Sequence, residues 1–371
     1  MGASPRAPDA RLSDNDVLMT TPETQILVDV REAHRFDVAA LERYLAPRIA
    51  GFIPPVQIRQ FLGGQSNPTY HLTAGDRQYV LRRKPPGQLL PSAHAVDREH
   101  RVITALRDTD VPVPRTYLLC EDASVVGTPF FVMDFVPGRI FADPMMPGVA
   151  REERAAIYDA MNDVMARLHH VDWKAVGLSD FGRPGNYFAR QIHRWTSQYR
   201  ASETERIDAM EKLIPWLPDH VPADDETTLV HGDYRPGNLI VHPTEPRVVA
   251  VLDWELSTLG HPLADVAYNC VPYHTGPGDN LGGVEGVDLR DLGIPGEEDY
   301  VDTYCRRVGR GRIADWDFYV AFALFRLAAI AQGIMGRVVA GTANDPNARL
   351  RGERARPLAD AAWTVVERRA V

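Results

Sequence analysis

The strongest constraint on the fold comes from two short apolar segments in the second half of the chain, joined by a proline-bounded turn. Residues 239–241 and 248–252 are rich in Val, Leu and Ile, which predicts two strands. Segment 243–246 begins and ends with proline and predicts the turn between them. A hairpin folded about this turn places Asn238 and Asp253 at the same open end, roughly opposite each other.

A third polar side chain lies upstream, in the loop that leads into the hairpin. The apolar pair Leu229 and Val230 precedes this loop, which carries Asp233. If the hairpin forms, the side-chain oxygens of Asp233, Asn238 and Asp253 converge on one place. Carboxylate and amide oxygens are the ligands that Mg²⁺ prefers, and the remaining carboxylate is left to handle a proton. Phosphoryl transfer needs this set, because it requires a group that positions the attacking hydroxyl and ligands for Mg²⁺ on the nucleotide phosphates.

The length and composition of the chain indicate its general class. At 371 residues the chain exceeds a single typical core, so we expect two lobes or two domains. Hydrophobic residues at 44% and charged residues at 25% are typical of a soluble globular enzyme. The formal net charge of −9 argues against nucleic acid or a membrane surface as the partner.

The targeting and cysteine patterns favour a cytoplasmic protein. We expect no membrane span and no secretory signal, because neither a long apolar run nor an apolar N-terminal segment is present. Cys120, Cys270 and Cys305 are scattered and form no CxxC pair, so they predict neither a disulfide framework nor a zinc site. We expect them to be buried thiols in a reducing compartment.

The order of predicted elements favours a bilobal α+β fold. Residues 1–49 predict an N-terminal arm, which is flexible or lies on the surface as far as about residue 29, followed by a helix. Residues 50–136 predict a small lobe with an antiparallel β-sheet and one prominent helix. Residues 137–371 predict a larger, mainly helical lobe into which the catalytic loop and hairpin are set. Pro137-Gly138 is either a hinge between the lobes or an ordinary strand end.

A glycine-rich turn is expected to join the first two strands of the small lobe. Gly63 and Gly64 can expose backbone N–H groups, and Ser66 and Asn67 add further donors. Such a turn can lie over phosphate groups, although most glycine turns only join strands. Both interpretations stay open from the sequence.

Three cations, Arg82, Arg83 and Lys84, follow at the end of the third predicted strand. One of them could pair with a phosphate group, or all three could belong to a solvated strand end. The next predicted helix, residues 96–106, carries Glu99. Glu99 could hold Arg82 or Arg83 in an ion pair, or it could be one of the exposed charges of the helix.

Two other classes of protein fit parts of the pattern. A metallohydrolase could use four residues near the hairpin: His231, Asp233, Asp253 and His261. The sequence lacks the HxH pair that would favour a His-bound transition metal. A nucleotide-binding pseudokinase is the other alternative, although the intact Asp233, Asn238 and Asp253 argue against it.

The motif HGDYRPGN at 231–238, followed by VLDWE at 251–255, resembles the catalytic core of the aminoglycoside phosphotransferase family of kinase-like small-molecule kinases. The likeness covers roughly residues 35–345 and is similar in detail to the branch found as a kinase-like domain fused to acyl-CoA dehydrogenase in animals. It implies a protein-kinase-like bilobal fold with nucleotide in the cleft. Four further segments resemble nucleotide-binding parts of the family, namely the covering loop GGQSNPTYHL, the cation-bearing strand YVLRRKPPG, the helix DREHRVITAL and the adenine-binding hinge FFVMDFVPG.

The resemblance implies roles for individual residues. Asp233 would be the catalytic base, and His231 would support the loop. Arg235 would offset charge on the moving phosphoryl group, unless it is a solvated loop residue. Asn238 and Asp253 would hold Mg²⁺. The implied nucleotide-binding positions are Gly63, Gly64, Ser66 and Asn67 over the phosphates, Arg82 paired with Glu99, and the backbone of Met133, Asp134, Phe135 and Val136 at adenine.

One position departs from the family pattern. Arg82 stands where the family often has Lys, and its larger, forked guanidinium prefers bidentate contacts, so a different phosphate geometry is expected. The neighbouring Arg83 and Lys84 remain candidates for the same role. Asp265, in HPLADVAY, resembles the buried aspartate with which the family braces its catalytic loop.

The resemblance implies an ATP- and Mg²⁺-dependent kinase that phosphorylates a hydroxyl group of a small molecule. Aminoglycosides are polycations and need an acid-lined site, whereas arginines cluster at 306–312 and 337–369 in this chain. A solvated helix face also explains such clusters. We expect a neutral or anionic hydroxylated metabolite, and a hydroxyacyl thioester of coenzyme A fits both the charge and the family branch. The oligomeric state, monomer or homodimer, and the choice between ATP and GTP stay open.

Overall fold

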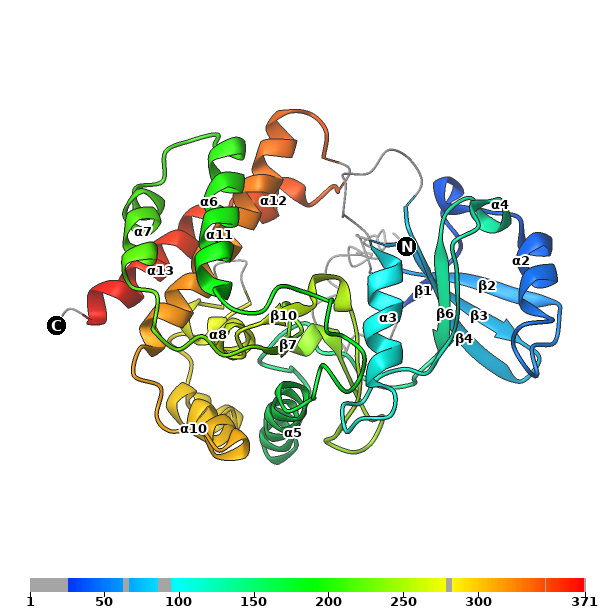
Figure 1. The fold of residues 1–371 in the computed structure, drawn as a ribbon, viewed down its shortest axis with the longest axis horizontal. Coiled ribbons are helices and arrows are strands. Elements are labelled where there is room, and N and C mark those ends of the chain that lie inside the picture. Colours follow the sequence, from blue (N-terminus) through cyan, green and yellow to red (C-terminus); the bar gives the residue numbers. More distant parts are fainter. Residues whose placement is uncertain (1–25, 63–66, 86–94, 278–281, 344, 370–371) are drawn as a thin grey trace, which may run out of the picture.

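The computed structural model describes residues 26–62, 67–85, 95–277, 282–343 and 345–369. Figure 1 shows a smaller lobe built on one β-sheet and a larger lobe of helices, with α3 (Val96–Leu106) between them. The bilobal α+β fold expected from the sequence is confirmed.

The small lobe is built on a six-stranded antiparallel sheet with the strand order β1-β2-β3-β4-β6-β5. Its strands are β1 (Leu27–Val28), β2 (Val56–Phe61), β3 (Thr69–Ala74), β4 (Arg77–Arg83), β5 (Thr116–Cys120) and β6 (Phe130–Asp134). Strand β1 corrects the sequence prediction, which assigned these residues to a surface arm. Leu27 instead pairs with Phe61 at the edge of the sheet.

Side chains alternate between the two faces of this sheet, and β4 shows the consequence most clearly. One face is covered by the helices α2 (Val38–Leu45) and α4 (Ala123–Val126), and the other by α3. Leu81 belongs to the core under α2 and α4, whereas Val80 belongs to the core shared with the large lobe. The same alternation directs Arg83 to the α2 face and Arg82 to the α3 face.

The large lobe packs around α11 (Trp316–Val339), which contacts α6, α8, α12 and α13. By length and composition α11 could cross a membrane, but 72% of its most apolar 18-residue window is buried inside the protein, as in the core helix of a soluble protein. The other helices are α5 (Arg151–His169), α6 (Tyr187–Ser202), α7 (Asp208–Asp219), α8 (Leu263–Cys270), α9 (Leu289–Leu292), α10 (Glu297–Val308), α12 (Ala348–Gly352) and α13 (Ala355–Arg369). Short 3-10 turns are η1 (Glu32–His34), η2 (Pro236–Asn238), η3 (Trp254–Leu256) and η4 (Val271–His274).

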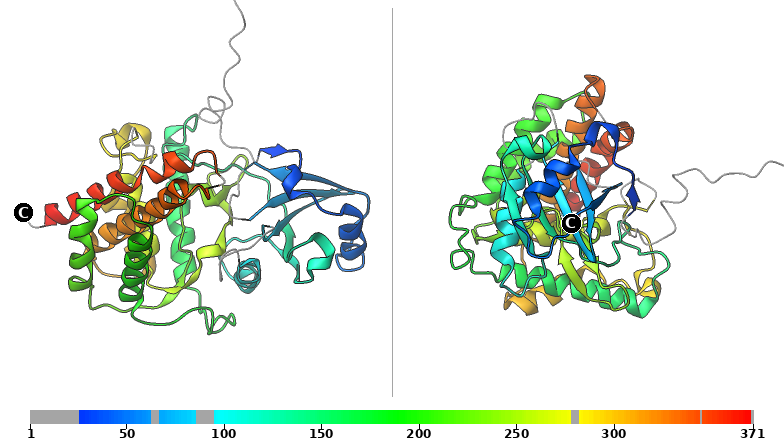
Figure 2. Two further views of the ribbon diagram at one scale, coloured as in Figure 1. Left: turned by 90° about the horizontal axis from the view of Figure 1, so that it is seen from above. Right: turned by 90° about the vertical axis from the view of Figure 1, so that its right-hand side faces the viewer.

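Two further views show how the helices are distributed. In Figure 2 the helices α6, α7, α11 and α13 lie at the end of the large lobe away from the small-lobe sheet. The part of the large lobe that meets the small lobe includes η3, which contacts α3. The segment with the predicted metal ligand Asp253 therefore lies where the two lobes meet.

The hairpin expected from the sequence is present. Strand β8 (Leu239–Val241) pairs antiparallel with β9 (Val248–Val251), with Leu239 opposite Val251. Just beyond this pair, the Leu252 N–H donates to the Asn238 carbonyl oxygen over 2.8 Å. Asn238 is thereby joined to the residue that precedes Asp253. A second strand pair, β7 (Thr228–Val230) with β10 (Thr258–Gly260), leads into the loop.

The connection between the lobes docks on this hairpin. A Cβ at Gly138 would lie 2.3 Å from the Ile240 side chain, so only glycine allows so close an approach. The Arg139 N–H donates to the Val241 carbonyl and the Val241 N–H donates to the Arg139 carbonyl, each over 2.8 Å. The chain is therefore attached to the large lobe from Arg139 onwards, immediately after the candidate hinge.

We expect Arg83→Met to lower the free energy of unfolding by about 2–4 kcal/mol. The Arg83 side chain is buried, with 3% relative exposure for the residue. Its guanidinium donates to the Tyr70 hydroxyl at 3.1 Å, the Val126 carbonyl at 2.6 Å and the His34 carbonyl at 3.0 Å. Removing it leaves these buried acceptors without a charged donor, a loss that urea unfolding would measure. Lys84→Met is the matched control, since the Lys84 ammonium makes a partly exposed ion pair with Asp97 at 3.8 Å. Equal losses in the two variants would contradict the structural role of Arg83.

Candidate active site

The loop between β7 and β8 carries the predicted catalytic residues, and its path depends on Gly232. Gly232 has a φ of 82°, in the left-handed region that favours glycine. A Cβ at this position would lie 2.6 Å from the Leu256 carbonyl oxygen. Glycine is therefore required for the loop to pass close to η3.

Helix α8 holds the loop through a buried carboxylate, that of Asp265. It accepts the backbone N–H of His231 at 2.6 Å and that of Gly232 at 2.8 Å. Burial by itself raises the pKa of Asp265, but the hydrogen bond and charge of His169, together with His231, hold that pKa below its ordinary value. The carboxylate therefore stays charged, and the two backbone donors stay bound to it.

Two further side chains hold the same loop, and neither was predicted from the sequence. The Asn269 amide, one turn after Asp265 on α8, donates to the Tyr234 carbonyl over 3.1 Å. The Arg326 guanidinium of α11 donates to the Gly232 carbonyl over 2.7 Å. The loop is thus attached at several successive residues to the helical core.

His231 supports the loop from inside and does not face solvent. Its side chain is fully buried, and its Nε2 atom donates to the Leu252 carbonyl over 2.9 Å. Its Nδ1 atom accepts the Asp233 N–H over 3.2 Å. Since both ring nitrogens are engaged, His231 connects the loop to the hairpin, which is the position expected for a supporting residue.

Asp233 and Asn238 are in direct contact. The Asn238 side-chain nitrogen donates to Asp233 Oδ2 over 2.7 Å and to the Asp233 carbonyl over 2.8 Å. Because this nitrogen uses both of its hydrogens here, Oδ1 is the atom of Asn238 that can bind a cation. Arg235 lies on the other side of the carboxylate, with its Nε atom 3.5 Å from Asp233 Oδ1 and its side chain 46% exposed.

Asp253 lies at the start of η3 in a conformation that few residues other than glycine adopt. Its φ of 65° and ψ of 57° are left-handed, which costs backbone energy and is common at functional sites. The oxygens of Asp253 and Asn238 are hard donors, and Mg²⁺ commonly takes one or two protein ligands and completes its octahedron with phosphate and water oxygens. These two residues therefore fit Mg²⁺ bound to nucleotide phosphates.

Arg82 is the cation of β4 that reaches the predicted metal ligand Asp253. Its Nε atom is 2.8 Å from Glu99, and its Nη2 atom is 2.5 Å from Asp253 and 4.0 Å from Glu255. Burial lowers the pKa of Arg82, but the three carboxylates outweigh it and raise that pKa, so the guanidinium stays charged. Burial also disfavours the charged form of Glu99, so it raises the pKa of Glu99. The charge of Arg82 opposes that rise. Of the three cations considered from the sequence, Arg82 is the one that pairs with Glu99, because Arg83 points to the opposite face.

The predicted adenine-binding segment, residues 133–136, continues from β6. The Asp134 N–H donates to the Arg115 carbonyl over 2.8 Å, and the Phe135 N–H donates to the Gln78 carbonyl over 3.4 Å. These two N–H groups are therefore used in hydrogen bonds to residues at the neighbouring strands. A nucleotide base bound at this segment would face the backbone carbonyl oxygens of Asp134 and Phe135.

An aromatic surface beside this segment was not predicted from the sequence. The ring of Phe135 is 4.7 Å from that of His71, which is 6.2 Å from that of Phe61, and both pairs meet edge to face. His71 lies opposite Val80 in the β3–β4 register, so it shares the sheet face with Arg82. The alternation of side chains along β2, β3 and β4 could have predicted from the sequence that these rings share one face of the sheet.

The glycine-rich turn falls largely outside the described residues. This applies to Gly63, Gly64 and Ser66, whose covering role over phosphates stays a prediction. Asn67 is described and is fully buried. Its carbonyl oxygen accepts a hydrogen bond from the Thr69 hydroxyl over 3.0 Å.

The metallohydrolase alternative is not favoured by the structure. Within the described ranges, no group of three or more His, Cys, Asp or Glu side chains is placed to hold a metal ion. His261 is buried beside the rings of Phe188 and Tyr319, with centroids 5.1 and 5.6 Å away. His231, as described above, uses both ring nitrogens within the fold. Within the part of the chain that the structure describes, the four proposed ligands are therefore not brought together as a metal centre.

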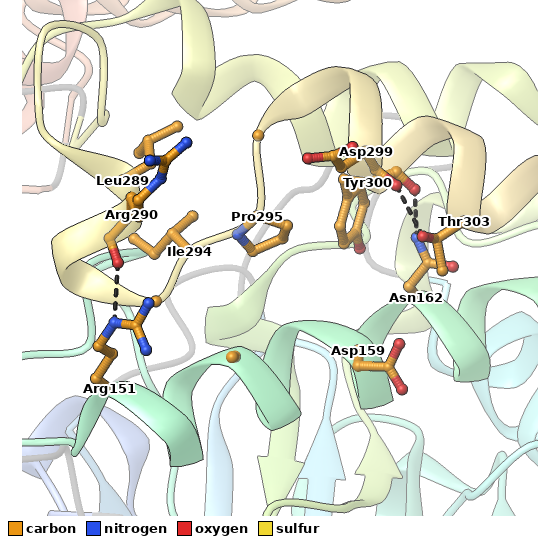
Figure 3. A pocket seen from close by; sticks show the side chains of 13 residues that line it. Arg151, Asp159, Asn162, Leu289, Arg290, Ile294, Pro295, Asp299, Tyr300 and Thr303 are labelled. Carbon is orange, nitrogen blue, oxygen red and sulfur yellow. Dashed lines mark hydrogen bonds between the residues drawn. The ribbon is translucent and has the colours of Figure 1, made fainter.

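A separate cavity of about 520 Å³ lies in the large lobe between α5, α9 and α10. Figure 3 shows Arg151 and Arg290 toward one end and Asp159 and Asp299 toward the other. The Arg151 Nε atom donates to the Arg290 carbonyl over 3.0 Å. The residues that line this cavity include none of the predicted catalytic or nucleotide-binding side chains.

The bilobal fold and the loop that joins Asp233 to Asn238 beside Asp253 define a kinase-like phosphotransferase. The sequence profile of the phosphotransferase enzyme family matches residues 57–313, more than half of the chain. The chain belongs to this family. Membership in a family of enzymes, together with the intact site, does not favour the pseudokinase alternative.

Similar proteins agree with this assignment and with the family branch expected from the sequence. A solved structure from Ralstonia eutropha, of a protein named for the aminoglycoside phosphotransferases, is 51% identical with a TM-score of 0.83, covering 90% of this chain and 99% of that one. Mouse acyl-CoA dehydrogenase family member 10 is 49% identical over 336 residues, which are 90% of this chain and 31% of the relative. Human acyl-CoA dehydrogenase family member 11 is 42% identical over 343 residues, 90% of this chain and 44% of the relative. The chain thus spans less than half of these curated relatives.

More distant solved structures share the fold. Aminoglycoside phosphotransferase APH(4)-Ia, solved in a ternary complex with ADP and hygromycin B, is 15% identical with a TM-score of 0.56. The match covers 87% of this chain and 98% of that one. At this identity the likeness concerns the architecture and not the substrate.

We expect His261 to make the protein less stable in acid. Burial lowers the pKa of His261 from 6.5 to about 4, because the interior disfavours the imidazolium. As the pH falls below 6.5, His261 is protonated in the unfolded chain before it is protonated in the folded protein. The free energy of unfolding therefore falls between pH 6.5 and pH 4. By pH 4.5 the loss is on the order of 2 to 3 kcal/mol.

Urea unfolding of wild type and His261→Asn at several pH values would test this effect. The Asn side-chain oxygen can still accept the Leu263 N–H, which donates to His261 Nδ1 over 3.2 Å. The variant is expected to show a shallower fall in stability between pH 6.5 and 4.5. Equal falls in the two proteins would contradict a buried neutral imidazole.

Proposed function

We propose that the protein is an ATP- and Mg²⁺-dependent kinase that transfers the γ-phosphoryl group of ATP to a hydroxyl group of a small metabolite. The observation that carries this proposal is the direct contact of Asn238 with Asp233, at 2.7 Å, on a loop bonded to the residue before Asp253. This arrangement supplies a base and two oxygen ligands within one loop and one hairpin. We also propose that the protein acts in the cytoplasm on soluble substrates, with neither nucleic acid nor a membrane as partner.

Asp233 acts as the base in this proposal. Asn238 occupies one carboxylate oxygen and Tyr268 the other, so the remaining lone pairs have defined directions. Asp233 accepts the proton of the acceptor hydroxyl while the hydroxyl oxygen bonds to the γ-phosphorus. At the same time the bond between the γ-phosphorus and the bridging oxygen breaks, and that oxygen leaves with ADP. Arg235 is close enough to offset negative charge on the moving phosphoryl group.

The nucleotide phosphates would be bound from both lobes. Asn238 Oδ1 and the Asp253 carboxylate would hold Mg²⁺, which when bound neutralises charge on the β- and γ-phosphates. Arg82, kept charged by Glu99, would pair with the phosphates from the small lobe. Because Arg82 also contacts Asp253, the phosphate-binding cation and the metal ligand form one charge network.

The aromatic surface of the small lobe supports a purine site. Phe61, His71 and Phe135 share the sheet face on which Arg82 lies. Their rings offer an apolar contact for a planar base next to the carbonyl groups of residues 133–136.

We propose that the acceptor is a neutral or anionic hydroxy compound, with a hydroxyacyl thioester of coenzyme A as the leading candidate. Arg235 and Arg326 place positive charge close to Asp233, which disfavours a polycationic acceptor. The curated relatives are named as acyl-CoA dehydrogenases, and this chain covers 31% and 44% of two of them. A kinase region joined to an acyl-CoA dehydrogenase region is consistent with a shared acyl-CoA substrate.

The arginine clusters do not add to this support. Arg307 pairs with Asp159 at 2.7 Å, and Arg310 pairs with Asp224 at 2.9 Å. Such contacts stabilise the surface of the large lobe, as the solvated-face interpretation of the sequence expected. The charge argument for the acceptor therefore rests on Arg235 and Arg326.

We expect Asp233→Ala to lower kcat by about 10²- to 10⁴-fold, the range for loss of a general base. ATP should still raise the melting temperature of this variant, because Asp233 is not needed to bind the nucleotide. Asp253→Ala should lose the Mg²⁺-dependent part of that rise. Asp360→Ala, an exposed carboxylate on α13, is the matched control and should resemble wild type in both assays. Wild-type turnover in Asp233→Ala would contradict the base assignment.

We expect hydroxyacyl-CoA compounds to be better acceptors than kanamycin-type amines. One avoided contact between like charges is worth about a tenfold difference in kcat/KM, and a polycation would make several. ADP release with ATP and Mg²⁺, screened over hydroxylated metabolites and confirmed by the mass of the product, measures this preference. Efficient phosphorylation of kanamycin-type amines without reaction of hydroxyacyl-CoA would contradict the proposed acceptor class.

A further inference from the structure

Helix α8 presents a third side chain to the catalytic loop, besides Asp265 and Asn269. Tyr268 lies on the same helix, and its hydroxyl donates a hydrogen bond to Asp233 Oδ1. The Asn238 amide donates to the other oxygen, Oδ2, over 2.7 Å. Both oxygens of the proposed base are therefore held, one from α8 and one from the loop itself.

The ring of Tyr268 is itself in contact with a cation, Arg326. The guanidinium carbon of Arg326 lies 5.6 Å from the centre of the Tyr268 ring and 5.5 Å from that of Trp195. This distance suits a cation–π contact. Arg326 also donates to the Gly232 carbonyl over 2.7 Å, so the cation behind the ring is itself fixed to the catalytic loop. The position of the phenol is thus set by α8 and α11 together.

The phenol keeps its proton under ordinary conditions. Burial raises the pKa of Tyr268 above its ordinary value, and the charge of Asp233 raises it further. Tyr268 therefore acts as a hydrogen-bond donor to Asp233 and does not become a second base.

We propose that Tyr268 is a positioning residue for phosphoryl transfer, which fixes the Asp233 carboxylate in the orientation that meets the acceptor hydroxyl. This role rests on the proposed function of Asp233 as the base. The acceptor proton passes to Asp233, the acceptor oxygen bonds to the γ-phosphorus, and the electron pair of the broken bond leaves with ADP. The Tyr268 proton stays on the phenol throughout. Because Tyr268 and Asn238 each occupy one lone pair, the acceptor hydroxyl is confined to the directions that remain.

Tyr268→Phe removes the hydroxyl and keeps the ring. We expect kcat to fall at least about tenfold, the effect of losing one charge-assisted hydrogen bond at the base, with the KM for ATP changed less than about twofold. Tyr273→Phe is the matched control, since the Tyr273 hydroxyl donates to the Pro295 carbonyl over 2.8 Å. This control should keep kcat within about twofold of wild type. An unchanged kcat in Tyr268→Phe, or equal losses in both variants, would overturn the proposal.

A second measurement does not depend on activity. Proton NMR of the wild type should show a slowly exchanging phenolic proton shifted downfield by its bond to a carboxylate. The signal should be missing from Tyr268→Phe and Asp233→Ala but present in Tyr273→Phe. Its absence from the wild type would overturn the Tyr268 contact. If the signal is present but no acceptor, including water, supports ATP turnover, the proposed function fails and the positioning role fails with it.

Discussion

The Asp265 carboxylate accepts the backbone N–H groups of His231 and Gly232, and the rest of the catalytic loop depends on this buried contact. Asp265, Tyr268 and Asn269 are spaced so that one face of α8 meets the loop. Asp265 holds the start of the loop, and Tyr268 holds the carboxylate of Asp233. Asn269 holds Tyr234, the residue after Asp233. Because α8 packs on the core helix α11, the orientation of the proposed base is determined by the packing of the large lobe.

The small lobe contributes Arg82 to the candidate site, because side chains along β4 alternate between the two faces of the sheet. Arg83 turns into the core under α2 and α4, where it donates to the carbonyl groups of His34 and Val126. Arg82, one residue earlier, turns to the other face and spans Glu99 and Asp253. One strand thus supplies a structural arginine and a site arginine. The Arg82–Asp253 contact joins the small lobe to the part of the large lobe that carries the proposed metal ligands.

Features that depend on neighbouring residues could be predicted from the residues themselves. Contacts between distant residues were either implied by the family resemblance, as for Asp265 with the loop, or were not predicted. The hairpin and its open end follow from a local pattern of strands and turn, and the helix expected over residues 96–106 was found with those bounds. The choice among Arg82, Arg83 and Lys84 needed the face of β4 to be known. Tyr268 contacts Asp233 from 35 residues away and Arg326 contacts Gly232 from 94, and no short motif marks either contact.

The central claim is that Asn238, Asp253 and Arg82 together form the phosphate and metal site of a kinase. A crystal structure of the protein with Mg²⁺ and a non-hydrolysable ATP analogue tests it most directly. We predict Mg²⁺ bound by Asn238 Oδ1 and Asp253, the γ-phosphate facing Asp233, and the guanidinium of Arg82 on a phosphate while it keeps its contact with Glu99. A nucleotide bound with its phosphates away from Asp253, or a metal ion held without Asn238 and Asp253, would contradict the claim.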